Sequence, residues 1–259
     1  MVLTRSQARK KATFPFLDLP AELRTAIYHL ALGGRIIHVD RGGGSHEKQS
    51  ETDARTSVCE ASILDKESYA LKRLPVDRRE GLGNSSRHNA CNTPAAKNLP
   101  LSFLSVCKQI HQEAALVPFQ ANRFTFWNRK SLARFLRYLK PKQQNAITAM
   151  ILYQVHIQSG WESASHRSLK APRLLGLREV LICVELAPGD YLPFFGEGES
   201  IVSQTIQDDR VSGMGKLKAP KLNRVEVLIN NSSLGHIPPL TSAEIKAWEG
   251  RIKDMMLAK

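Results

Sequence analysis

The sequence has no long apolar run and few cysteines. Its densest apolar stretch, around residues 149–153, is far shorter than the roughly 20 residues that a membrane-spanning helix needs. Residues 1–11 are basic but contain no apolar stretch of the kind found in secretory signals. We therefore expect a cytoplasmic or nuclear protein that contacts no membrane and whose four cysteines remain reduced.

Short catalytic motifs are also missing. There is no Gly-x-Ser-x-Gly turn, no phosphate-binding Gly-Lys-Ser loop and no His-Glu-x-x-His helix. Cys107 and His111 have the i, i+4 spacing that could form a Cys–His nucleophile. A cysteine in an apolar helix usually packs as a small hydrophobic residue, so we expect both side chains to be buried there. We therefore predict a protein that is not an enzyme and has no catalytic residues.

Cysteine and histidine lack the paired spacing of a structural zinc site. His88 and Cys91 form one loose pair, Cys59 has no close companion, and His46 or His111 would have to supply a fourth ligand. Structural zinc is normally held by four such ligands in tight pairs. We predict no metal and no cofactor, with zinc on Cys59, His88 and Cys91 as the alternative.

Acidic residues are absent from residues 114–161, in a chain whose net charge is +13. The segment carries seven cations, of which Arg134, Arg137 and Lys140 lie on the polar side of a predicted helix and form a basic face. A basic face can be an ordinary solvated surface, or it can attract an acidic protein or nucleic acid. Phe124 and Phe126 alternate in a predicted strand and should both point inward, which removes them as a stacking surface for bases.

The first part of the chain predicts a short ordered unit after a basic, disordered tail at residues 1–13. Leu23, Ile27 and Leu30 are spaced as on one side of a helix, which Asp18 or Leu19 would cap and Gly33-Gly34 would end. Residues 35–40 predict a strand. Residues 41–58 and 75–98 are polar and predict loops on either side of a short helix at 62–74, so that 41–98 forms a mobile insertion.

The rest of the chain alternates helices and strands. One helix is expected over 101–114, ended or kinked by Pro118, and one strand over 122–127. An amphipathic helix should start at Ser131, bury Leu132, Phe135, Leu136 and Leu139, and end at Pro141. Three apolar strands (147–157, 177–186, 222–229) and a helix (241–259) should follow. The lead-ins that begin at Ala171 and Ala219 are similar, which hints at a leucine-rich-repeat-like array.

Two of these segments resemble a known family. Leu19-Pro20-Ala21-Glu22-Leu23, with Ile27-Tyr28 after it, is similar to the opening helix of F-box domains, and Val106-Cys107-Lys108 is similar to their closing helix. The run is more similar still to fungal F-box-like proteins. Their pattern is Leu-Pro-x-Glu-Leu-Arg-x-x-Ile-Tyr, a variable insertion, Val-Cys-Arg-Gln-Ile-x-x-Glu-Ala, and Asn-x-Phe-x-Phe. The match covers about residues 14–157 and includes Arg24, Gln109, Glu113, Ala114 and Asn122.

The resemblance implies a docking module that binds the small adaptor subunit of a cullin–RING ubiquitin ligase. The implied docking residues are Leu19, Pro20, Leu23, Ile27, Val106 and Ile110. An F-box normally joins its helices by short loops, whereas a long insertion here could leave that surface incomplete or covered. The alternative is that apolar side chains of the two helices form the core of the unit, namely Leu19, Leu23, Ile27, Leu104, Val106 and Ile110.

The sequence as a whole predicts an α+β protein. A split F-box-like helical unit (14–157, with the insertion at 41–98) should precede a C-terminal strand and helix region (158–259) packed on the same core. This small sheet, backed by helices, would be weakly leucine-rich-repeat-like. The predicted function is a protein-interaction adaptor, with a substrate receptor of a ubiquitin ligase as its specific form. A basic nucleic-acid-binding protein that uses residues 114–161 is the alternative.

Overall fold

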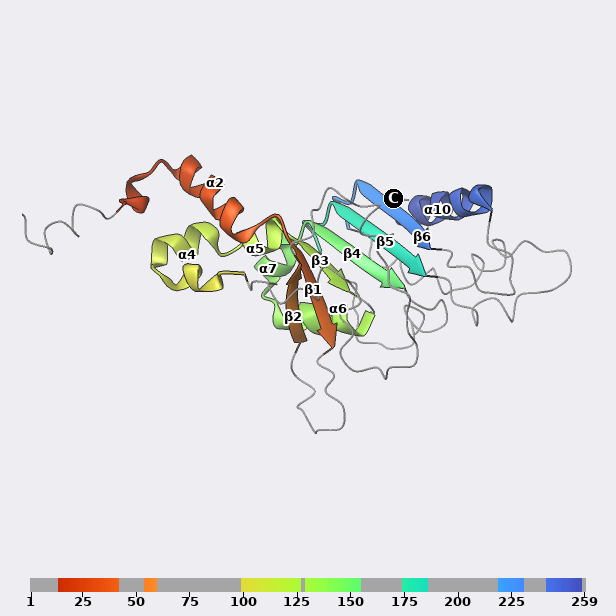
Figure 1. The fold of residues 1–259 in the computed structure, drawn as a ribbon, viewed down its shortest axis with the longest axis horizontal. Helices are drawn as coiled ribbons and strands as arrows, with labels where there is room; N and C mark the ends of the chain where they lie inside the picture. The colour runs from red at the N-terminus through yellow and green to blue at the C-terminus, as the bar shows by residue number, and fades with distance from the viewer. Residues whose placement is uncertain are drawn as a thin grey trace, which may run out of the picture.

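The chain folds into a mixed α+β structure in which a twisted sheet carries a group of helices at one end (Figure 1). The computed structural model describes residues 14–41, 54–59, 99–126, 129–154, 174–185, 219–230 and 241–257. The strands are β1 (Ile36–Arg41), β2 (Ala54–Cys59), β3 (Arg123–Phe126), β4 (Ala149–Gln154), β5 (Glu179–Glu185) and β6 (Arg224–Asn230). The helices are η1 (Phe16–Asp18), α2 (Ala21–Leu32), η3 (Leu101–Ser105), α4 (Lys108–Ala114), α5 (Val117–Gln120), α6 (Arg129–Tyr138), α7 (Pro141–Ala146) and α10 (Ser242–Leu257).

The sheet is parallel except at one edge. Its strand order is β2-β1-β3-β4-β5-β6, and only β2 runs antiparallel to its neighbour. One row across five strands shows why it folds: Ile37, Phe124, Met150, Val180 and Val225 are register partners, and all are buried. The opposite face also buries side chains, among them Ile36, His38, Thr125, Ile151 and Leu181. Burial on both faces is typical of parallel strands.

Two helices complete the main core on the face that contains Phe124. α6 contributes Leu132, Phe135 and Leu136, and α10 contributes Trp248, Ile252 and Met256. Phe124 and Phe126 both lie in this core and contact Phe135, so the predicted inward orientation of the two aromatic residues is confirmed. The amphipathic pattern of residues 131–139 therefore identified both the helix and its buried side, although not its first residue.

Except for α7, the remaining helices form a second unit, which we call the helical lobe (η1, α2, η3, α4 and α5). It projects from the end of the sheet next to β1 and β2, away from α10 (Figure 1). Its own small core contains Tyr28, Leu32, Ile110, Ala114 and Val117. The two segments that build the lobe are more than 60 residues apart in the sequence, yet they share one core.

Several predicted boundaries were wrong. The helix expected over 101–114 is broken, because η3 ends at Ser105 and α4 starts at Lys108 with Cys107 as its N-cap. The Cys107 sulfur accepts a hydrogen bond from the Ile110 amide at 3.5 Å. α2 starts after Pro20 and not after a side-chain cap from Asp18. α6 begins at Arg129, before Ser131, and Pro141 begins α7.

The polar segment at 41–58 is not entirely a loop. Residues 54–59 form β2, which pairs antiparallel with β1 from Ile36↔Cys59 to Arg41↔Ala54. A strand at a sheet edge can carry polar side chains. The low hydrophobicity of β2 therefore led to the incorrect prediction of a loop. The predicted helix at 62–74, the loop at 75–98 and the tail at 1–13 lie outside the described residues.

Similar turns lead into β5 and β6. The Leu177 amide donates to Leu174 O at 3.1 Å, and the Leu222 amide donates to Ala219 O at 3.0 Å. Glu179 and Arg224 are register partners, so the two turns occupy equivalent places. The equivalent turns therefore pair Leu174 with Ala219, three residues away from the Ala171–Ala219 alignment that the sequence suggested.

Candidate protein-docking site

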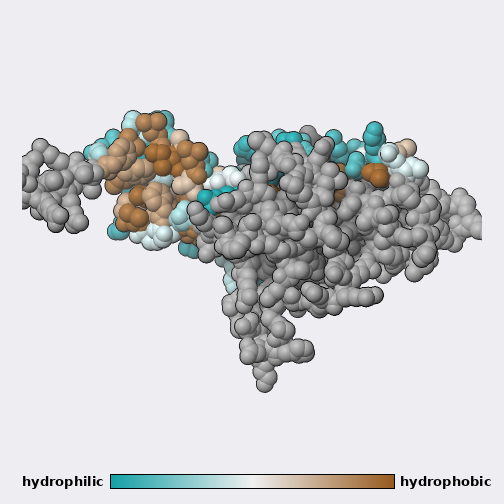
Figure 2. Space-filling model, in the orientation of Figure 1, coloured by the Kyte–Doolittle hydropathy of each residue, from teal (hydrophilic) through white to brown (hydrophobic). Residues whose placement is uncertain are grey.

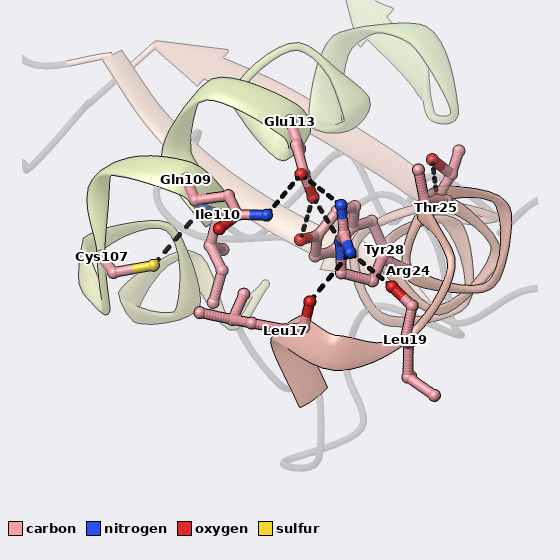
Figure 3. A network of polar contacts seen from close by, with 10 residues as sticks. Leu17, Leu19, Arg24, Thr25, Tyr28, Cys107, Gln109, Ile110 and Glu113 are labelled. Atoms are coloured by element: carbon pink, nitrogen blue, oxygen red, sulfur yellow. Dashed lines mark hydrogen bonds and ion pairs between the residues drawn. The ribbon is translucent and has the colours of Figure 1, made fainter. Parts of the chain in front are cut away.

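A polar network joins the two segments of the helical lobe (Figure 3). The Arg24 guanidinium donates from Nε to Glu113 Oε2 at 3.0 Å and from Nη2 to Glu113 Oε1 at 2.7 Å. The Tyr28 hydroxyl donates to Glu113 Oε2 at 2.7 Å. A bidentate guanidinium–carboxylate pair fixes orientation as well as distance. α2 and α4 are therefore held in one relative position.

The same arginine also holds η1. Its Nη1 donates to the carbonyl oxygens of Leu17 and Leu19, at 3.1 Å for Leu17. The Arg24 side chain is only 11% exposed, so it satisfies these acceptors largely out of water. Phe16, Tyr28 and Phe103 pack beside it, with ring centroids 5.7 to 6.0 Å apart. Arg24 of α2 thus links η1 and α4 within the lobe.

The network shifts two ionisation equilibria. Hydrogen bonds from Arg24 and then Tyr28 lower the pKa of Glu113 from 4.5 to about 2. Burial, followed by the hydrogen bond to Glu113, raises the pKa of Tyr28 from 10.0 to about 12. Both shifts favour the ionised Glu113 with a neutral Tyr28 across the physiological pH range.

We expect the lobe to lose stability at both pH extremes. Because folding lowers the pKa of Glu113, its contribution is complete above 4.5 and is lost as the pH falls from 4.5 toward 2. Because folding raises the pKa of Tyr28, its contribution is complete below 10.0 and is lost as the pH rises from 10.0 toward 12. Thermal unfolding is measured between pH 7 and pH 2. As the pH falls, the melting temperature should decrease less for Glu113→Gln than for the native chain. Equal decreases in both proteins would contradict this assignment.

Asn122 connects the lobe to the sheet. Its Nδ2 donates to Leu32 O at 2.6 Å and to Pro118 O at 2.8 Å, and its Oδ1 accepts from the Arg35 amide at 2.9 Å. Asn122 is 1% exposed. One buried amide therefore satisfies the end of α2, the start of α5 and the entry to β1.

The backbone approaches closely at the same junction. The Gly34 amide donates to Ala121 O at 2.8 Å, and Gly34 has a φ of 75°, which favours glycine. A Cβ on Gly33 would lie 2.5 Å from the Cβ of Ala121. The pair Gly33-Gly34 therefore ends α2, as predicted, and also allows the end of α2 to approach Ala121, the C-cap of α5.

The most exposed apolar side chains of α2 form what we call the α2 stripe: Leu23, Ile27 and Leu30. They are 52%, 36% and 82% exposed. Their i, i+4, i+7 spacing places them on one side of the helix, whereas the buried Tyr28 and Leu32 lie on another. The helix thus has one apolar side in the lobe core and a second that faces solvent. Figure 2 shows apolar surface gathered over this lobe.

The predicted docking residues separate into two groups. Pro20, Leu23, Ile27 and Val106 are exposed, and Leu19 is half-buried. Ile110 is 4% exposed and belongs to the lobe core, so its assignment to a docking surface was wrong. The core interpretation was in turn wrong for the exposed residues. The docking prediction omitted Leu30, although this residue continues the α2 stripe. Other exposed apolar residues on or next to the lobe are Phe14, Leu17 and Leu101.

Charge is scarce on the lobe. Residues 14–34 and 99–121 contain the cations Arg24 and Lys108 against the anions Asp18, Glu22 and Glu113. The +13 charge of the chain therefore resides elsewhere. Depletion of charge beside exposed apolar groups is typical of the centre of a protein interface and unlike a phosphate-binding surface.

The other candidate residues do not assemble into a reactive site. Cys107 is half-buried and caps α4, whereas His111 is exposed, with its Nδ1 3.3 Å from Leu104 O, so the expectation that both are buried was wrong for His111. Within the described ranges, no group of three or more His, Cys, Asp or Glu side chains is placed to hold a metal ion. His46, His88 and Cys91 lie outside those ranges. No helix in the part of the chain that the structure describes is long and apolar enough to cross a bilayer.

The fold and this surface define an α+β protein with a braced helical lobe that exposes apolar side chains. The chain belongs to the family of the domain of unknown function DUF7730, whose model matches residues 7–173. This match includes the helical lobe, β1 to β4, α6 and α7. No curated protein and no solved structure matches the chain.

Proposed function

We propose that the helical lobe is a docking module that binds another protein through the α2 stripe. The observation that carries this proposal is the exposure of Leu23, Ile27 and Leu30 on a helix whose opposite side is fully used in the lobe core. Full burial of one such side chain contributes about 1.5–3 kcal/mol of favourable free energy. A partner that covers the stripe recovers this free energy on a surface that is already rigid.

The specific form of this proposal is an F-box-like unit that binds the small adaptor subunit of a cullin–RING ubiquitin ligase. Support comes from the sequence resemblance and from the way the two matching segments pack together. Arg24 and Glu113 are 89 residues apart in the chain and form a bidentate ion pair. The long insertion therefore does not prevent α2 and α4 from forming one helical unit.

The sheet region would then serve as the substrate receptor. β3, β4, β5 and β6 are adjacent, parallel and in chain order, and equivalent turns precede β5 and β6. These features support a weakly leucine-rich-repeat-like array. A regular parallel array presents the same edge of successive units to a partner, which suits recognition better than catalysis.

Isothermal titration of the purified full chain with the purified adaptor subunit tests this function. We expect saturable one-to-one binding with a negative heat-capacity change, because apolar surface is buried. A titration with bovine serum albumin gives the control for nonspecific apolar contact. Size-exclusion chromatography of the mixture checks for co-elution. The ligase form of the proposal is rejected if about 100 µM adaptor gives neither heat nor co-elution. Binding would then be weaker than about −5.5 kcal/mol.

A further inference from the structure

The basic face, defined by Arg134, Arg137 and Lys140, is a second surface with its own chemistry. Leu132, Phe135 and Leu136 of α6 are buried in the main core. Arg134 is half-buried, and Arg137 and Lys140 are exposed. Arg134 and Arg137 are i, i+3 neighbours, and helix periodicity places them on the side opposite Leu132. The two arginines therefore lie on the outer side of α6, whose inner side is held in the main core, and Lys140 follows as the N-cap of α7.

Among the described residues, the cations of the basic face lack the carboxylate partners that three other arginines have. Arg24, Arg123 and Arg224 are each paired with a carboxylate, with shortest N–O distances of 2.7 to 3.0 Å. In the ranges that the structure describes, no side chain of the basic face forms an ion pair. The sequence supplies no acid between residues 114 and 161. No described residue neutralises the face through an ion pair, so its positive charge can attract an external partner.

The end of α6 is also held in place. Gln144 of α7 donates from Nε2 to Leu136 O at 2.7 Å and to Leu139 O at 3.1 Å. The Lys140 amide donates to Gln143 Oε1 at 2.9 Å. These bonds fix the turn between α6 and α7, from which Lys140 projects. A partner would therefore meet cations carried on a fixed backbone.

We propose that the basic face binds a short acidic segment of another protein. The guanidinium groups of Arg134 and Arg137 can each pair with a carboxylate through two hydrogen bonds. Arg134 and Arg137 are three residues apart in α6, about 4.5 Å along the helix axis at 1.5 Å per residue. Lys140 follows three residues later as the N-cap of α7. A short segment with two or three Asp or Glu residues matches the face in charge.

Nucleic acid fits this surface less well. Binding to a duplex typically involves about 6–10 phosphate contacts, and binding to a single strand uses exposed aromatic side chains. The face offers three cations, and the aromatic residues of β3 are buried: Phe124 is 3% and Phe126 0% exposed. Nucleic-acid binding is therefore the competing outcome of the test.

Fluorescence anisotropy with defined peptides tests the proposal. The probe is a fluorescein-labelled peptide with five consecutive glutamates between glycines, and the reference peptide has glutamines in their place. We expect the native chain to bind only the glutamate peptide, and Arg134→Glu with Arg137→Glu to raise its Kd about tenfold, because two attractions become repulsions. Lys246→Glu with Lys253→Glu on α10 changes the net charge equally at exposed sites, and should alter the Kd less than about twofold.

Two further measurements separate the outcomes. Because Arg134 is half-buried, Arg137→Glu with Lys140→Glu provides a second variant at exposed positions only, with the same expected loss. A 20-nucleotide single strand and a duplex of the same length are titrated in parallel. The proposal is overturned if the glutamate peptide does not bind, or if the α10 variant weakens binding as much as the α6 variants. It is also overturned if nucleic acid binds more tightly than the peptide and the α6 variants abolish that binding.

Discussion

Replacing Asn122 with alanine should lower the free energy of unfolding by about 4 kcal/mol, because buried hydrogen-bonding groups left unpaired each cost about 1–3 kcal/mol. The substitution leaves Leu32 O, Pro118 O and the Arg35 amide without the partners they have in the native chain. A loss of this size is a large fraction of the 5–15 kcal/mol that typically stabilises a domain. Urea unfolding followed by circular dichroism measures it directly.

Asn145→Ala provides the matched control for this prediction. Asn145 is half-buried, and its Oδ1 is buried without a hydrogen-bond partner in the described part of the chain. Its replacement should cost less than about 1 kcal/mol, since no Oδ1 hydrogen bond is lost. If both variants lost the same stability, Asn122 would not be the connection between the helical lobe and the sheet that its contacts indicate.

The sequence predicted most elements but did not distinguish the buried side of α2 from the exposed side. Leu23, Ile27 and Leu30 form a regular apolar pattern, which suggested either a core or a docking side without distinguishing them. The core instead uses Tyr28 and Leu32. A tyrosine can be buried here because its hydroxyl donates to Glu113, a partner supplied by a helix far along the chain. Helical periodicity contains no information about such a partner.

The resemblance pointed to residues whose role the spacing alone did not reveal. Four polar residues occupy positions of the fungal F-box-like pattern that the sequence resembles: Arg24, Tyr28, Glu113 and Asn122. They form the polar contacts that hold the lobe together and join it to the sheet. The predicted docking residues were all apolar and did not include these four. A polar residue that occupies a position of this pattern could have indicated the network, because a buried polar group needs a defined partner.

Two local errors have separate physical causes. β2 was missed because its sequence, Ala-Arg-Thr-Ser-Val-Cys, has little apolar alternation, and its pairing with β1 is a tertiary contact. The break between η3 and α4 was missed because the apolar spacing continues across it. Cys107 adopts an extended backbone (φ −157°, ψ 167°) and caps α4 with its sulfur, a role more often filled by Ser, Thr, Asp or Asn.

Replacing Leu23 and Leu30 together with alanine should weaken binding of the ligase adaptor about 30-fold. Each truncation removes an apolar contact worth about 1 kcal/mol at an interface, and about 1.4 kcal/mol changes an affinity tenfold. The variant should fold normally, because both side chains are exposed in the free protein and alanine favours helix. Isothermal titration measures the affinity, and thermal unfolding checks that the melting temperature is unchanged.

Two single variants distinguish docking from packing. Leu175→Ala removes an exposed leucine, 44% accessible, that lies outside the helical lobe, and it should leave adaptor binding unchanged. Leu32→Ala removes a fully buried leucine from the lobe core, and should cost about 2–5 kcal/mol of stability. If the Leu23 and Leu30 variant unfolds as readily as Leu32→Ala, the α2 stripe packs as core and is not a free surface. If Leu175→Ala weakens binding to the same extent, the adaptor recognises apolar surface in general, and the α2 stripe is not its docking site.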